Sequence, residues 1–158
     1  MDKISIKRHE NKYNKYFKEI IDQQEMIKII EKNREDKNEY VDINFKIAGK
    51  KIFAFLLVLN DLTIGIACLD ELDFENKNCK FKAGIFKEYL DLVNEEQVIQ
   101  CIKEILAFQE RYLGIRRSFG VIDSQSAFIN SIDYNFKKEG INLNKDKIYY
   151  SHLVKDSE

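Results

Sequence analysis

The segment from Asn94 to Gly114 is the most strongly determined element of this sequence, and it organises the residues on both sides. Its apolar residues recur at the three- and four-residue spacing of an amphipathic helix, with polar residues between them. They are Val98, Ile99, Ile102, Ile105, Leu106, Tyr112 and Leu113. Asn94 is a good N-cap, and Gly114 accepts the left-handed conformation that follows many helices. We therefore expect one long helix with a single buried face.

The runs before and after this helix predict a strand–helix–strand unit. Residues 80–86 and 119–122 are short runs rich in apolar and aromatic side chains, as is typical of strands. A helix that connects two strands of one sheet makes a crossover, so the two strands should be parallel neighbours. A short helix is then expected before residues 135–140.

An apolar hairpin is predicted upstream of this unit. Residues 52–59 and 62–69 are two apolar runs separated by Asn60 and Asp61, a polar pair of the kind that forms tight turns. Gly65 inside the second run indicates a bulge. Together with residues 80–86, these runs should form an antiparallel meander.

The chain before residue 52 predicts less regular structure. Residues 3–9 can form a first strand, and the apolar pattern of residues 15–32 fits one or two amphipathic helices that pack on the sheet. Residues 31–39 are rich in Lys, Asn and Glu with charges of alternating sign, which favours a solvated helix end or loop.

The C-terminal residues predict a last hairpin. Residues 141–154 read as a strand, an Asn-Lys-Asp turn and a second strand. Tyr149 and Tyr150 alternate across that second strand, so one should pack inward and the other should reach a cleft. The fold class expected from all these elements is α/β, with a mixed, mostly antiparallel seven-stranded sheet and helices on both faces.

Composition limits the possible partners and location. A chain of 158 residues suits a single domain over residues 1–158, and its formal net charge of -1 gives no overall attraction to nucleic acid or to an anionic membrane. No apolar run approaches ~20 residues, and the first residues lack the apolar core of a signal peptide, so we expect a cytoplasmic protein. Cys68, Cys79 and Cys101 lack metal-ligand spacing and are expected to be reduced, buried thiols.

Three stretches give the chain a resemblance to a known family. They are residues 69–86, 113–117 and 135–140, where Asn-Phe-Lys-Lys-Glu-Gly follows a small-residue helix that contains Ala127. In order and spacing they resemble the GNAT N-acetyltransferases, over roughly residues 52 to 140. The resemblance implies the acetyltransferase fold and transfer of an acetyl group from acetyl-coenzyme A to a primary amine. The branch it looks most like acetylates ribosomal-protein termini and polyamines.

The resemblance also implies where the coenzyme lies. In this family the pantetheine arm bonds to the main chain of the fourth strand, here around Ile85, Phe86 and Lys87, in a gap between that strand and the next. Ser124 aligns with an asparagine that touches the arm after the fifth strand. The turn that holds the pyrophosphate aligns with residues 93–98.

That turn departs from the family pattern. Relatives place glycines and a basic residue there, so that bare main-chain amides at a helix start hold the phosphates. This chain has Asn94, Glu95, Glu96, Gln97 and Val98 instead, a combination that predicts a capping box with two acidic residues in the first turn. A phosphate charge about 5 Å from a carboxylate, at an effective dielectric near 20, is repelled by about 3 kcal/mol. The turn therefore predicts weak coenzyme binding, or none, unless the two carboxylates point to solvent or pair with a cation such as Lys87 or Lys103.

Acyl transfer to an amine needs a base and an acid. Glu71 lies beyond the third strand, where such enzymes often place a basic carboxylate; the alternative is a solvated turn acid. Ser131 aligns with the tyrosine that many members use as the acid. Tyr134 could replace that tyrosine if the short helix were rotated; the alternative is a core aromatic beside Phe136.

Two functions of different classes remain open. The first is an N-acetyltransferase that uses acetyl-coenzyme A, with a protein terminus, a polyamine or a small molecule as acceptor. The second is a GNAT-like domain that has lost coenzyme binding and serves as a binding or dimerisation module, such as a homodimer. The turn at residues 94–97 favours the second function, and the frame around it shows only that the fold is retained.

Overall fold

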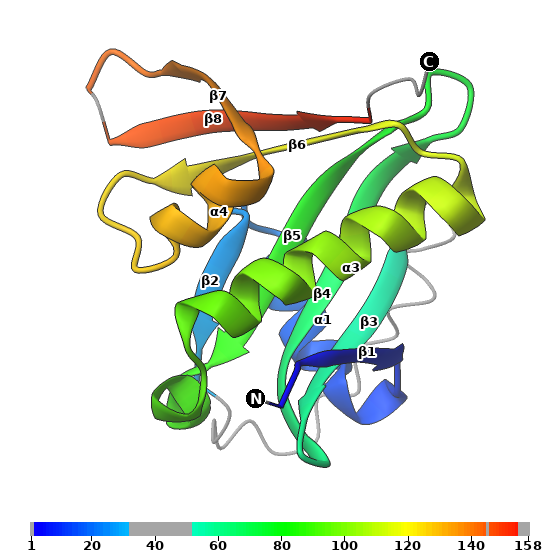
Figure 1. The fold of residues 1–158 in the computed structure, drawn as a ribbon, viewed down its shortest axis with the longest axis vertical. Coiled ribbons are helices and arrows are strands. Elements are labelled where there is room, and N and C mark those ends of the chain that lie inside the picture. The colour runs from blue at the N-terminus through cyan, green and yellow to red at the C-terminus, as the bar shows by residue number, and fades with distance from the viewer. Residues whose placement is uncertain (1, 32–51, 145, 155–158) are drawn as a thin grey trace.

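The computed structural model describes residues 2–31, 52–144 and 146–154. They form an eight-stranded sheet in the order β1-β3-β4-β5-β6-β8-β7, with β2 paired to β5 off this path (Figure 1). The strands are β1 (Ser5–Arg8), β2 (Ile27–Ile30), β3 (Phe53–Leu59), β4 (Leu62–Asp73), β5 (Asn78–Phe86), β6 (Arg117–Asp123), β7 (Lys137–Ile141) and β8 (Lys147–Leu153). The helices are α1 (Asn14–Ile21), α3 (Glu95–Leu113) and α4 (Ile129–Asn135), with 3-10 turns η1 (Asn11–Tyr13) and η2 (Lys87–Leu92).

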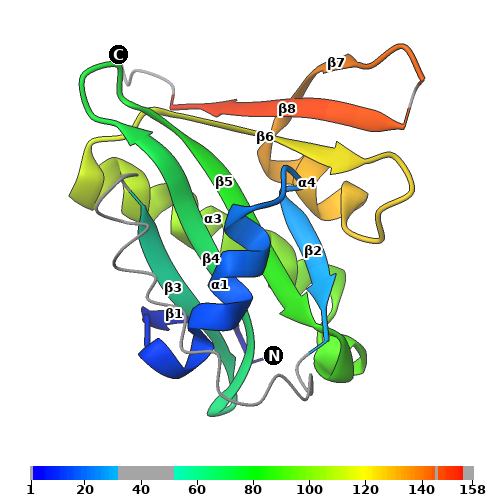
Figure 2. The same ribbon diagram turned by 180° about the vertical axis from the view of Figure 1, so that it is seen from behind.

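Helices cover both faces of the sheet. The long helix α3 crosses one face with α4 beside it, whereas α1 lies on the opposite face (Figures 1 and 2). Each face has its own apolar core: Ile102 and Ile105 of α3 pack against one face, and Phe17 and Ile20 of α1 pack against the other. The β2–β5 and β5–β6 pairs are parallel, and the remaining strand pairs are antiparallel. The predicted α/β class with a mostly antiparallel sheet is confirmed.

The hairpin and the bulge lie where the sequence places them. Asn60 and Asp61 have φ of 49° and 67° and join β3 to β4. Two successive positive φ angles fit the type I′ turn, which matches the twist of a hairpin. Leu57 pairs with Gly65 but Val58 pairs with Thr63, so the irregularity adjoins Gly65. The β3–β4–β5 meander is confirmed.

The long helix is confirmed at both ends. It starts after Asn94, and it ends at Gly114, whose φ of 66° is left-handed. Because an L side chain at this angle is strained, glycine stabilises the end of the helix. The buried residues Val98, Ile102, Ile105 and Leu106 lie on its predicted apolar face.

The prediction of helices over residues 15–32 is only partly right. The helix α1 ends at Ile21, and Ile27–Ile30 is the strand β2, which gives the sheet eight strands where we expected seven. A short apolar run such as Ile-Lys-Ile-Ile fits a buried strand as well as a helix turn, and only its tertiary neighbours decide. The expected loop at residues 31–39 lies outside the described residues beyond Glu31.

The last hairpin is present but starts earlier than predicted. The strand β7 begins at Lys137, and the side chain of Asn142 accepts main-chain hydrogen bonds from Asp146 and Lys147 to close the turn. Tyr150 is buried and donates its hydroxyl proton to Asp133, while Tyr149 is 45% exposed. The predicted alternation of these two tyrosines is therefore confirmed.

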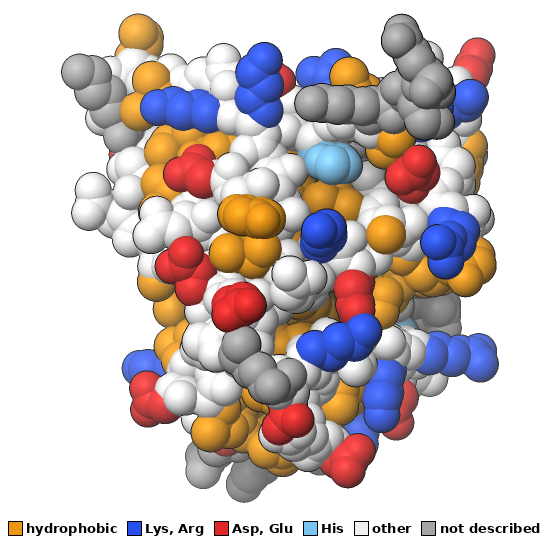
Figure 3. All heavy atoms as spheres, viewed as in Figure 1, with side chains coloured by type: hydrophobic (Ala, Val, Ile, Leu, Met, Phe, Trp, Pro, Cys, Tyr) orange, Lys and Arg blue, Asp and Glu red, His pale blue; other side chains and the backbone are white. Residues whose placement is uncertain are grey.

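The molecular surface carries charges of both signs. Acidic and basic side chains are interspersed over the face that α3 covers (Figure 3). Within the described residues, no helix is long and apolar enough to span a membrane. The same residues contain no group of three or more His, Cys, Asp or Glu side chains arranged to hold a metal ion.

Candidate active site

The candidate site is built where two parallel strands separate. The strands β5 and β6 pair from Asn78 with Arg117 to Lys80 with Phe119 and then diverge. The parallel neighbours expected from the sequence are therefore present, and they open into a gap beyond Lys80. This is the gap in which the family resemblance places the pantetheine arm of the coenzyme.

The strand β2 occupies the β5 side of this gap. The N–H group of Met26 donates to the carbonyl oxygen of Val121 on β6 at 2.6 Å, and the N–H group of Ala83 on β5 donates to the carbonyl oxygen of Met26 at 2.6 Å. Beyond this bridge, β2 runs parallel to β5 with Ile27 opposite Ala83 and Ile30 opposite Phe86. Met26 therefore joins the two diverging strands.

Two of the three residues predicted to hold the coenzyme arm around the fourth strand are thus paired within the protein. Ile85 lies opposite Ile29 and Phe86 opposite Ile30, and both predicted residues are buried. Lys87 follows the end of the ladder, is exposed, and lies 3.9 Å from a carboxylate oxygen of Glu31. The position implied by the resemblance does not fit a coenzyme arm, because its edge of β5 already has a strand partner.

The burial of β2 shows how firmly it is held. Met26 and Ile30 are fully buried and Ile27 is 4% exposed. Burying one such side chain contributes roughly 1.5–3 kcal/mol, so withdrawing all three would cost on the order of 5–9 kcal/mol. At about 1.4 kcal/mol per tenfold change, a ligand that displaced β2 would lose more than three decades of affinity. The burial of these side chains therefore strongly disfavours displacement of β2 by a ligand.

Two glycines make room for β2. A Cβ atom at Gly84 would lie 2.2 Å from Cδ1 of Ile30, and one at Gly120 would lie 2.3 Å from Cγ of Met26. Neither distance is compatible with a side chain larger than hydrogen unless a neighbour moves. Glycine at these two positions of β5 and β6 therefore leaves the space that β2 needs between the two strands.

The start of α3 carries the predicted capping box. The side chain of Asn94 accepts from the N–H group of Gln97 at 2.9 Å, and the side chain of Gln97 accepts from the N–H group of Asn94 at 3.0 Å. Gln97 also donates to the main-chain oxygen of Asp2 at 2.7 Å. Glu95 and Glu96 are exposed in the first turn, and Val98 is buried in the core. The helix start is therefore bonded to its own side chains and bordered by two carboxylates, which disfavours an anion there.

The predicted catalytic residues lie on different elements. Glu71 is on an irregular part of β4 with a φ of 49°, and its carboxylate lies 2.7 Å from Nζ of Lys80. Ser131 is 2% exposed inside α4, whereas Tyr134 on the same helix is 68% exposed. The alternative that Tyr134 packs in the core is therefore wrong. No hydrogen bond or ion pair within the described residues joins Glu71, Ser131 and Tyr134 to one another.

A second opening, which sequence reasoning missed, lies on the other side of β2. A cavity of about 430 Å³ separates β2 from the segment that connects β6 to α4, and its lining includes Ile27, Ile29, Ser126 and Phe128. Ser124, the predicted arm contact, lies in this connection and is half-buried, with its N–H group bonded to the main-chain oxygen of Asp146 at 2.8 Å. No sequence signal marks the cavity, because it exists only once β2 is a strand.

An ion-pair cluster borders this cavity through Glu25 and Asp123. Nζ of Lys147 lies 3.0 Å from Glu25 and 3.5 Å from Asp123. The bond to Glu25 raises the pKa of Lys147, and the N–H group of Gln125 lowers the pKa of Asp123. Asp123 and Lys147 face each other on β6 and β8 and carry opposite charges. These opposite charges are the sequence signal that could have indicated the ion-pair cluster.

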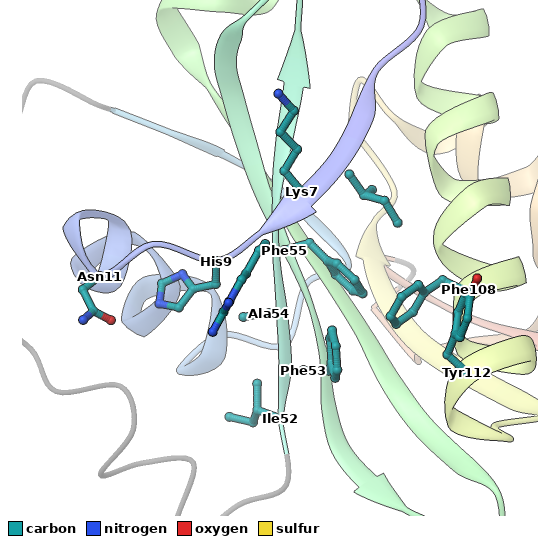
Figure 4. Close-up of a pocket in the computed structure, with 11 residues that line it drawn as sticks. Lys7, His9, Asn11, Ile52, Phe53, Ala54, Phe55, Phe108 and Tyr112 are labelled. Atoms are coloured by element: carbon teal, nitrogen blue, oxygen red, sulfur yellow. The ribbon is translucent and has the colours of Figure 1, made fainter.

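A larger cavity of about 900 Å³ lies away from the gap, at the β1 edge of the sheet. Figure 4 shows Phe53, Phe55, Phe108 and Tyr112 gathered between β3 and α3, with His9 on the other side of the same cavity. Successive rings in this group lie 5.0–5.2 Å apart. The cavity contains none of the predicted site residues, so it contributes nothing to the assignment of chemistry.

Comparison with known proteins identifies the fold. No family model and no curated protein sequence matches the chain. Spermidine N-acetyltransferase from Vibrio cholerae, solved in complex with CoA and spermine, superimposes with a TM-score of 0.69 at 11% identity, covering 96% of this chain and 95% of that one. A dodecameric structure of the Vibrio cholerae enzyme gives a TM-score of 0.68 at 11% identity, covering 96% and 94%. A probable acetyltransferase gives a TM-score of 0.64 at 16% identity, covering 96% and 93%. The chain therefore has the fold of the GNAT N-acetyltransferases.

Proposed function

We propose that this protein transfers an acetyl group from acetyl-coenzyme A to a primary amine. The observation that carries the proposal is the parallel pair β5–β6, which separates after Lys80 and Phe119 within a fold shared with N-acetyltransferases over 96% of the chain. The acceptor class is a polyamine, a protein terminus or a small molecule. Of these, the polyamine is supported by the substrates named for the structural neighbours.

The reaction needs few groups from the protein. The amine nitrogen loses a proton and attacks the thioester carbon, the carbon–sulfur bond breaks, and the departing thiolate gains a proton. Glu71 is the proposed base, and its ion pair with Lys80 keeps the carboxylate oriented beside the start of the gap. Tyr134 is a better proposed acid than Ser131, because its side chain is exposed while that of Ser131 is buried in α4.

A thiol-release assay tests this function. The purified protein is mixed with acetyl-coenzyme A and with spermidine, spermine or a peptide with a free N-terminus, and free coenzyme A is followed with a thiol reagent. The three cysteines of the protein are buried, so the folded protein adds little background. Amine-dependent thiol release supports the proposal. Absence of release with every amine, together with no thermal stabilisation by millimolar acetyl-coenzyme A, would contradict it.

A second function is favoured by a specific observation. The capping box of α3 and the pairing of β2 with β5 both remove features that hold coenzyme A in relatives. A GNAT-fold binding or dimerisation module, acting as a homodimer or a larger homo-oligomer, would need neither feature. The thermal measurement separates the two functions, because only the enzyme requires the coenzyme to bind.

Organisation and location are proposed together with the function. The described strands of one sheet run from Ser5 to Leu153, which supports one domain over the chain. Three free, buried cysteines are typical of a reducing compartment, which supports a cytoplasmic location.

A further inference from the structure

The strand β2 has two edges, and only one of them is paired along its length. Its inner edge faces β5 over four residue pairs from Ile27 with Ala83 to Ile30 with Phe86. Its outer edge meets β6 at the single bridge between Glu25 and Val121. Within the part of the chain that the structure describes, no strand pairs with the outer edge of Ile27–Ile30. The gap between β5 and β6 is thus moved one strand outward, to lie between β2 and β6.

The register assigns the main-chain groups of β2 to the two edges. The carbonyl oxygen of Met26 accepts from Ala83 of β5, and successive residues of a strand direct their N–H and C=O groups to opposite sides. Lys28 therefore directs its main-chain N–H and C=O groups to β5. Ile27 and Ile29 direct their main-chain N–H and C=O groups to the outer edge. Both residues line the 430 Å³ cavity, and the Ile29 side chain is 40% exposed. The cavity therefore offers an open strand edge.

An open edge of this kind binds an extended chain that carries secondary amides. The pantetheine arm of acetyl-coenzyme A is such a chain. We propose that the arm pairs with the outer edge of β2, at Ile27 and Ile29, and not with β5; this inference rests on the proposed function. The apolar side chains of Ile29 and Phe128 flank the edge, and Ser126 lies across the cavity.

The two ends of β2 give the arm a direction. Before the first residue of β2, Glu25 pairs with Val121 of β6, and the carboxylates of Glu25 and Asp123 are held by Lys147. At the last residue of β2, Ile30 lies opposite Phe86, after which the chain passes through η2 toward the start of α3 (Figure 1). The thioester would lie at the Glu25 end of β2, and the nucleotide would leave at the Ile30 end, beyond the capping box of α3.

Amide exchange measured by NMR tests the site directly. On addition of acetyl-coenzyme A, the amides of Ile27 and Ile29 should become at least tenfold better protected, while those of Ala83 and Ile85, already paired with β2, should not change. The opposite pattern, with new exposure of the β2 amides, would overturn the inference, because β2 would have left the sheet. No change at any amide would overturn both the inference and the proposed function.

A pair of variants adds an independent measurement. Ile29→Pro removes the outward N–H group and keeps the bonds to β5, as proline does on an edge strand. Ile29→Ala removes most of the side chain and keeps that N–H group. The dissociation constant of acetyl-coenzyme A, measured by calorimetry, should be about tenfold weaker for the proline variant than for the alanine variant. Equal dissociation constants for the two variants would show that the arm does not pair with β2 at Ile29.

An acetylation assay, combined with the binding measurements, distinguishes failure of the proposed site at β2 from failure of the proposed function. Protection of Ile27 and Ile29 without acetylation of any amine would refute the proposed function and leave the site in place. Acetylation with equal affinities for the two Ile29 variants would refute the site and leave the function in place. If the proline variant does not fold, the exchange experiment on the unmodified protein still decides.

Discussion

Gly120 on β6 faces the side chain of Met26 so closely that an added Cβ atom would lie 2.3 Å from Cγ of the methionine. The contact links β6 of the parallel pair β5–β6 to the strand β2. Since Met26 also bonds to both β5 and β6, Gly120 and Met26 together fix the position of β2.

Gly120→Ala should therefore destabilise the protein. Overpacking of a filled core typically costs 1–3 kcal/mol, and the added methyl group here meets the fully buried Met26. Urea denaturation gives the free energy of unfolding. The control is Gly140→Ala, because an added Cβ atom at Gly140 has no neighbour within 4 Å. Equal stabilities of the two variants would show that β2 does not lie against β6.

Asp70→Asn should cost far more than Glu71→Gln, although the two residues are adjacent. Asp70 and Lys82 form a buried pair at 2.8 Å, and Lys82 also donates to the main-chain oxygen of Ile21 at 2.9 Å. Removing one partner of a buried pair costs about 3–5 kcal/mol, whereas an exposed pair such as Glu71 with Lys80 contributes about 0–1 kcal/mol. Chemical denaturation of both variants measures the difference, and similar losses would contradict this account.

Asn94→Ala should lower the free energy of unfolding by about 1 kcal/mol. The substitution removes the side chain that accepts from the N–H group of Gln97 at the start of α3. Asn94→Asp keeps an acceptor at the same position and should retain most of the stability. If the alanine variant is as stable as the unmodified protein in urea, the capping box has no energetic role.

Stability should fall as the pH drops below about 6.5 through protonation of His9. Burial lowers the pKa of His9 from its usual value of 6.5, and the hydrogen bond to Asn14 offsets this only partly. The unfolded chain therefore binds this proton more readily, so His9 contributes its full stability above the unfolded pKa and loses it as the pH falls toward the folded pKa. His9→Gln should reduce the dependence of the urea midpoint on pH between 7.5 and 5.5. An unchanged dependence would assign it to other groups.

The thiols should react only after unfolding. Burial raises the pKa of Cys79 and of Cys101 to about 12, and it also raises the pKa of Cys68. Because the thiolate is the reactive form, a colorimetric thiol reagent at pH 8 should modify the folded protein slowly. In guanidinium chloride all three thiols should react at once. Rapid modification of the folded protein would show that at least one thiol is accessible.

Features that depend on near neighbours in sequence could be predicted. The capping residues Asn94 and Gln97, the left-handed Gly114 and the turn at Asn60 and Asp61 are each determined within a few residues, and the structure confirms them. Helical spacing likewise gave most of the buried face of α3, but it was wrong for Tyr112, whose side chain is 67% exposed. These signals are local, so a single sequence carries them.

Features that depend on distant neighbours could not be predicted. The run Ile27–Ile30 becomes a strand because β5 and β6 separate and leave an edge to be paired, which the run itself does not encode. Gly84 and Gly120 show no turn or motif, and their role is visible only against Ile30 and Met26. The cavity of the candidate site could not be predicted for the same reason. It forms between β2 and the segment that connects β6 to α4, which lies about 100 residues later in the sequence.

The side chain of Gln97 has a practical consequence for anyone who produces this protein. One amide both completes the cap of α3 and binds the main-chain oxygen of Asp2, so the helix start is anchored to the beginning of the chain. A purification tag fused directly ahead of Asp2 would crowd that anchor. Recombinant protein for coenzyme measurements should therefore carry no tag at that position.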